Sequence, residues 1–162
     1  MVKDGVRHTR EGVIERTRRE FEALDALVRK LRPEDWARRA PRPPTRDPWT
    51  VKDVLAHIVY WKEHTARVFR GEKRPAEMRG LDVTQINRLV YEQWRDRSPD
   101  DVIRWHRDVQ STVMRALAEK PDEWFSRREH KSYWPGDFDG HSADHRVKDI
   151  EAALRRSDSQ HS

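Results

Sequence analysis

The stretch that decides the fold is WTVKDVLAHIVYW, residues 49–61. Thr50 has the side chain of a helix N-cap, and Asp53, three residues on, takes the position of the acid in a shortened capping box. Apolar residues then recur every three or four positions, which is the period of one buried helix face: Val51, Val54, Leu55, Ile58, Trp61 and Val68. The stretch therefore predicts an amphipathic helix that begins after Thr50 and stops before Gly71.

Helical patterns continue on both sides of residues 49–61. Each has an apolar stripe and a capping residue, a proline or a glycine near one of its ends. They predict four more helices: Thr9 to Leu31, Asp82 or Thr84 to Trp94, Ser98 to just before Pro121, and one that begins between Asp139 and Ser142 and ends near Arg156. Residues 33–48 hold too many prolines for a regular element, and no stretch shows the alternation of a strand.

Four long helices and one short extra helix predict an all-α fold, a four-helix bundle, built as a single domain over residues 1–162. The polar tail, residues 157–162, is expected to be disordered. A chain of this length can bury a hydrophobic core that is stable without disulfides or a structural metal. Because it has no cysteine, it has neither disulfides nor thiolate metal sites.

Charges of both signs are spread along the chain: 39% of residues are charged, with a net charge of +5. Acids and bases alternate within a turn, as in Arg18-Arg19-Glu20, which is typical of solvated helix faces and not of a phosphate-binding stripe. We therefore expect no nucleic-acid partner. No run approaches the ~20 apolar residues of a membrane span, and residues 1–5 lack the apolar segment of a signal peptide. We expect a cytoplasmic protein with no membrane partner.

Three histidines carry the chemistry that the sequence suggests. His141 and His145 are four residues apart, so on one helix both imidazoles face the same side and can bind one ion at ~2.0–2.1 Å. His57 lies in the middle of the helix that begins after Thr50, one turn before Trp61. Three neutral imidazoles with an open fourth position are typical of a catalytic metal site and not of a closed structural one.

Two ordinary explanations compete with a metal site. With eight histidines in the chain, an HxxxH pair arises easily by chance, and a lone His57 is often a hydrogen-bonded core residue. The apolar stripe of the last helix also points away from the histidine pair; its members are Val147, Ile150 and Leu154. That helix is therefore either buried on two sides, or its histidines face solvent.

Residues 49–58, followed by Trp61, resemble the second-helix signature of the DinB-like superfamily, whose members carry a metal-ligand histidine at the position of His57. The stretch HSADH, residues 141–145, falls where that superfamily places its C-terminal pair of histidine ligands. The combination of both motifs at this separation is more specific than either alone. The resemblance implies the four-helix bundle that the helical patterns predict.

Within the superfamily, the chain resembles the ClbS/DfsB family most, through INRLVYE at 86–92 and RDRS at 95–98. The match spans residues 49–150. There is one departure from the expected pattern: Asp149 stands four positions after His145, where an apolar residue is expected. This departure leaves the register of the last helix open.

The resemblance implies a divalent ion, zinc, nickel or iron, held by His57, His141 and His145. It also implies a homodimer and a small-molecule substrate, with the protein acting as a metal-dependent hydrolase or a thiol-dependent transferase on a small reactive electrophile. The alternatives are a non-catalytic module that binds a small molecule protectively, and a nucleic-acid partner. No catalytic residue is assigned. His64 is expected to support a ligand from outside the site, to replace a ligand, or to pack at the rim of the bundle. His106 is expected to be a residue of the core or of its rim.

Overall fold

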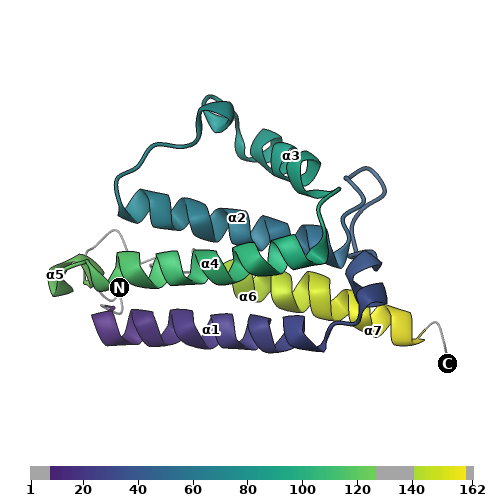
Figure 1. Ribbon diagram of the computed structural model, residues 1–162, viewed down its shortest axis with the longest axis horizontal. Coiled ribbons are helices and arrows are strands. Elements are labelled where there is room, and N and C mark those ends of the chain that lie inside the picture. The colour runs from purple at the N-terminus through teal and green to yellow at the C-terminus, as the bar shows by residue number, and fades with distance from the viewer. Residues whose placement is uncertain (1–7, 127–140, 160–162) are drawn as a thin grey trace, which may run out of the picture.

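Four helical segments run side by side in the computed structural model, which describes residues 8–126 and 141–159 (Figure 1). The long helices are α1 (Arg10–Lys30), α2 (Val51–Phe69) and α4 (Pro99–Ala118), and residues 141–159 supply the fourth segment. The short helix α3 (Val83–Trp94) lies outside this bundle, against α2. Over the described residues the fold is all-α, so the predicted four-helix bundle with one short extra helix is confirmed.

Shorter helical turns connect these helices. They are the 3-10 turns η1 (Pro33–Ala37) and η2 (Ala76–Met78) and the four-residue helix α5 (Asp122–Phe125). Within the described ranges, extended pairing is limited to a single bridge between Arg39 and Thr50. Nor do these ranges contain a helix that is long and apolar enough to cross a membrane.

Side-chain caps begin the helices where the sequence predicts. At the start of α2, Thr50 Oγ1 accepts from the backbone N–H of Asp53 (3.3 Å), and Asp53 Oδ2 accepts from the backbone N–H of Thr50 (2.9 Å). Asp82 and Gln85 form the same reciprocal pair at α3. Each pair satisfies two backbone donors that a helix start leaves without partners. Gly71, at φ +70°, follows α2, where a left-handed residue ends the helix.

α2 is the central helix and is buried on almost every side. α4, α3 and the last helical segment all pack against it. Four side chains of the predicted stripe are fully buried: Val51, Val54, Leu55 and Ile58. Val68, predicted on the same face, is 58% exposed. At ~100° per residue, ten residues bring Val68 to ~80° from Ile58 around the helix, so Phe69 takes the inward place instead.

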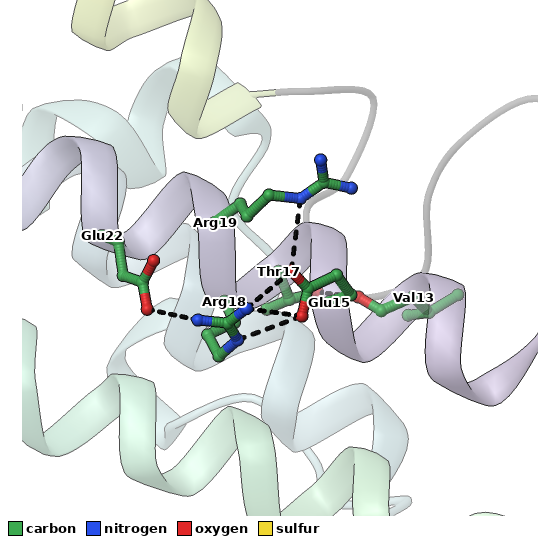
Figure 2. Close-up of polar contacts among 6 residues, drawn as sticks. All are labelled: Val13, Glu15, Thr17, Arg18, Arg19 and Glu22. Atoms are coloured by element: carbon green, nitrogen blue, oxygen red, sulfur yellow. Dashed lines mark hydrogen bonds and ion pairs between the residues drawn. The ribbon is translucent and has the colours of Figure 1, made fainter.

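α1 separates a buried face from a charged one. Its buried residues are Val13, Thr17, Leu24, Asp25 and Val28. Figure 2 shows Thr17 Oγ1 donating to the carbonyl of Val13 (2.7 Å). The same figure shows Arg18 between Glu15 (2.6 Å) and Glu22 (2.5 Å). Exposed pairs of this kind stabilise a protein little, and they are the solvated, mixed-sign face that the sequence predicts.

The last helical segment contains a π-helical turn, which the sequence did not predict. Its three parts are α6 (His141–His145), the π-helix η5 (Arg146–Glu151) and α7 (Ala152–Ser159). The wider turn changes which side chains face the core. Ile150 is 1% exposed, whereas Val147, predicted on the same stripe, is 42% exposed. α7 continues three residues past Arg156, and residues 160–162 of the tail predicted to be disordered lie outside the described residues.

The start of this segment is buried on two sides, which decides between the two arrangements that the sequence left open. His141 and His145 face α2, where both rings contact His57. Ser142 and Arg146 face α1, where both donate to the carboxylate of Glu20. The histidine pair therefore does not point into solvent, although the apolar stripe lies elsewhere on the helix.

Candidate metal centre

The three histidines predicted as ligands converge at one point between α2 and α6. One potential ligand atom from each of His57, His141 and His145 lies within 4.8 Å of the other two. His57 Nε2 is 3.0 Å from His141 Nε2, so these two atoms point at each other. Two nitrogens bonded to one ion at ~2.0–2.1 Å in tetrahedral geometry are ~3.3 Å apart. The His57–His141 pair is therefore close enough to share one ion, and the His145 atom lies near both.

Each ring is positioned by its own helix. The four-residue spacing within α6 places His141 and His145 on one face, with ring centroids 4.5 Å apart. His57 is in mid α2, where the central position of that helix leaves it 5% exposed. The ring of Trp49 packs against His57 from the other side, with a centroid distance of 4.8 Å. The third ring is therefore held from both sides.

Burial keeps two of the imidazoles neutral. It lowers the pKa of His57 to about 2, with the positive charge of protonated His141 and His145 and of Arg42 acting in the same direction. Burial, followed by the charge of protonated His145, lowers the pKa of His141 to about 4. Since a histidine must be neutral to bind a metal, both rings have the required form at neutral pH.

Asp149, which departs from the expected family pattern, makes a direct contact with the site. Its Oδ2 lies 2.5 Å from Nδ1 of His145, one helical turn earlier. A proton on Nδ1, donated to this carboxylate, leaves Nε2 of His145 with the free lone pair that a metal ion needs. Carboxylates placed in this way fix the tautomer and the ring plane of metal-ligating histidines. The sequence offered a signal for this contact in the four-residue spacing, but an apolar residue was expected there.

Asp53 serves as the helix cap that the sequence predicts. Its Oδ2 binds Thr50, while its Oδ1 is buried without a hydrogen-bond partner among the described residues. Nδ1 of His57, one turn later, is also buried and without a partner there. Asp53 and His57 therefore each have a polar atom on the same face of α2 that lacks a partner among the described residues.

A cavity of about 750 Å³ opens next to the three histidines, and His57, His141, His145 and Asp149 form part of its wall. Aromatic rings form another part of the wall: Trp49, Trp61 and Phe69. This volume suits a small organic molecule. The walls are contributed by α2, the loops before and after it, α3 and the last helical segment, so the cavity exists only in the folded bundle.

The two remaining histidines discussed from the sequence have different positions. His64 lines the cavity with its ring edge-on to Trp61, at 5.4 Å, and burial lowers its pKa. It is outside the three-histidine cluster. His106 is a core residue: its Nε2 lies 3.2 Å from Asp25 Oδ1, and its ring stacks on Phe21 at 4.8 Å.

Comparison with known proteins identifies a family and solved structures of similar fold. The sequence model of the family described as Mycothiol maleylpyruvate isomerase N-terminal domain matches residues 17–158. An uncharacterised protein from Escherichia coli UTI89 has a TM-score of 0.73 and 11% identity, over 94% of this chain and 96% of that chain. The colibactin self-resistance protein ClbS, crystallised in complex with a dsDNA, has a TM-score of 0.58 and 11% identity, over 97% of this chain and 98% of that chain. No curated protein matches. At this identity, the two structures establish the fold alone.

Proposed function

Because the chain belongs to the mycothiol maleylpyruvate isomerase N-terminal domain family, in the DinB-like superfamily, we propose that it is a metal-dependent enzyme whose ion is held by His57, His141 and His145. The observation that carries the proposal is the convergence of the three rings beside a cavity of about 750 Å³. The likeness to ClbS expected from the sequence is confirmed at the level of the fold.

The donor set fits a divalent transition metal. Neutral imidazole nitrogens suit zinc, nickel and iron alike. Three such ligands with a further position open to a cavity are the arrangement of catalytic sites, whereas structural zinc sites are closed by four protein ligands. Asp149 supports this ligand set by accepting from Nδ1 of His145, which keeps that ring in the tautomer whose Nε2 is free to bind a metal.

We propose that the reaction is hydrolysis of a small reactive electrophile, or transfer of a low-molecular-weight thiol to it. A bound divalent ion would act as a Lewis acid and polarise such a substrate. The residues of the chain hold the ligand rings neutral and oriented, and the rings of Trp49 and Trp61 supply an apolar wall for the substrate. The name of the matched family includes mycothiol, which supports a thiol as the co-substrate.

A protective binding module without turnover is the second candidate. It is favoured by the size and aromatic wall of the cavity, which suit sequestration of a small apolar molecule. The name of ClbS describes a self-resistance protein, and its crystals contain duplex DNA. For this chain we propose a small molecule as the partner, because the candidate ligands line a cavity and not an open surface.

Metal content tests the proposed site directly. Elemental analysis of tag-free protein should find one divalent ion per chain. Each of the variants His57→Ala, His141→Ala and His145→Ala should lose most of it, while His106→Ala should keep it. A chelator should lower the melting temperature of the wild type and leave that of the three variants unchanged, because bound metal stabilises the fold by mass action. Full metal occupancy in each single variant would exclude the site.

Turnover separates the two candidate functions. Zinc-loaded protein is mixed with 4-nitrophenyl acetate, or with 1-chloro-2,4-dinitrobenzene and a monothiol, and product is followed by absorbance. An enzyme gives a rate above the uncatalysed one that is lost in His57→Ala. Full metal binding without any rate enhancement across such electrophiles would favour the protective binding module.

A further inference from the structure

The cavity beside the histidines has a positively charged wall. Three arginines line it, Arg42, Arg46 and Arg74, and Asp149 is the one carboxylate among its described lining residues. Asp149 is already bonded to His145. Within the described part of the chain, none of the three guanidinium groups forms an ion pair. A cleft lined by one sign of charge attracts a ligand of the opposite sign.

Arg42 has the most constrained position of the three. Its guanidinium lies over the ring of Trp49, 3.7 Å from the ring centroid, and the same ring contacts His57. Stacking of this kind holds the planar group in one orientation and leaves its N–H edge available. Arg42 is therefore connected through a single side chain to the candidate metal ligands.

One atom of Arg42 lacks a partner. Its Nη1 is buried and has no hydrogen-bond acceptor among the described residues. Burial, and then the charge of Arg46, lower the pKa of Arg42, while Asp47 and Asp149 act in the opposite direction. A buried charged donor without an acceptor is costly. An anion in the cavity would supply the missing acceptor.

The rest of the cavity is suited to an apolar body. Trp61 and Phe69 form part of the wall. Val68 and Val83 line the same cavity, although their side chains are 58% and 57% exposed. Large apolar residues left exposed at a cavity are typical of a binding site.

We propose that Arg42 is the anion-binding residue of this cavity, and that its ligand is a carboxylate on an aromatic or otherwise apolar body. The carboxylate accepts from Nη1 of Arg42 beside the three histidines, and the body lies against Trp61 and Phe69. A planar guanidinium matches a carboxylate with two parallel hydrogen bonds. This inference rests on the proposal that the cavity is the substrate site, and it deepens it by naming the substrate class.

Calorimetric titration with a matched pair of probes tests the proposal. The probes are 1-naphthoate and its neutral analogue 1-naphthamide, and both are titrated into chelator-treated and zinc-loaded full-length protein. In both forms 1-naphthoate should bind at least ~10-fold more tightly, because a hydrogen bond to a charged group contributes about a factor of ten or more. Arg42→Gln should remove this preference, Arg42→Lys should retain part of it, and Arg104→Gln, an exposed substitution on α4, should leave it unchanged.

The two forms of the protein keep the outcomes distinct. Zinc that fails to bind would contradict the metal site and leave the comparison of the two probes valid in the chelator-treated form. Equal binding of acid and amide by the wild type, an absence of binding by both, or an acid preference that survives in Arg42→Gln would overturn the anion site.

Discussion

Asp149 is the residue whose position in the structure most changes its interpretation. In the sequence it occupies a place where an apolar residue is expected, and in the structure its carboxylate accepts from His145 at 2.5 Å. Asp144, on the same helix, is a suitable contrast, because its carboxylate binds Lys148 on the exposed side. Two acids five residues apart therefore have different surroundings.

We predict that Asp149→Ala lowers the affinity for zinc by ~10–100-fold, the usual effect of removing the outer partner of a metal ligand. Asp144→Asn should leave the affinity unchanged. Competition with a chromogenic chelator measures both. Asp149→Asn should retain part of the affinity, since an amide oxygen still accepts from Nδ1 of His145. Equal zinc affinities for Asp149→Ala and the wild type would show that the contact does not position the ring.

The lowered pKa of His106 should make the free energy of unfolding depend on pH. Burial, followed by the charge of Lys62, lowers its pKa to about 4. In the unfolded chain its pKa is ~6.5, so between these values the unfolded state binds more protons. The free energy of unfolding should therefore be highest above pH ~6.5 and should fall as the pH drops towards 4. His57 and His141, whose pKa values are also lowered, act in the same direction in metal-free protein.

His106→Gln should make this fall less steep by up to one proton, or ~1.4 kcal/mol per pH unit. The substituted amide still donates to Asp25, so the hydrogen bond is retained while the titration is removed. Urea unfolding of metal-free protein at several pH values measures the slope. Identical slopes for the variant and the wild type would contradict the assignment of this titration to His106.

At the scale of elements, the start of a helix was more predictable than its inward face. Residues within three positions of one another make the caps, as Thr50 and Asp53 do. The inward face depends on which neighbours surround the helix. α2 has neighbours on several sides, so its buried set is wider than a single stripe and yet excludes Val68.

The two ends of the α2 stripe give a matched test of this assignment. We predict that Ile58→Ala lowers the free energy of unfolding by ~2–5 kcal/mol, because it removes a fully buried side chain. Val68→Ala should change it by less than ~0.5 kcal/mol, the usual range for exposed positions. Urea unfolding measures both, with circular dichroism as the probe. Similar losses for the two variants would show that the described face of α2 is wrong.

At the scale of the whole molecule, the resemblance to dimeric relatives predicts a homodimer in which the same surface of each copy forms the contact. Sedimentation equilibrium over a wide range of concentrations measures the mass in solution. The expected result is twice the chain mass of 19.5 kDa. A mass of one chain at every concentration would exclude the dimer and leave the bundle and the proposed metal site unaffected.

The sequence by itself determined the helices and their caps, because these depend on residues within about one turn of each other. His141 and His145 share a face for that reason, whereas His57 became a candidate ligand through the family resemblance. The tertiary structure decided that His57 meets them, since the packing of α2 against α6 joins residues 84 positions apart. It also decided the role of Asp149 and the stacking of Arg42 on Trp49. The loop before α2 has no regular period, and the family pattern placed an apolar residue at position 149, so neither contact followed from the sequence.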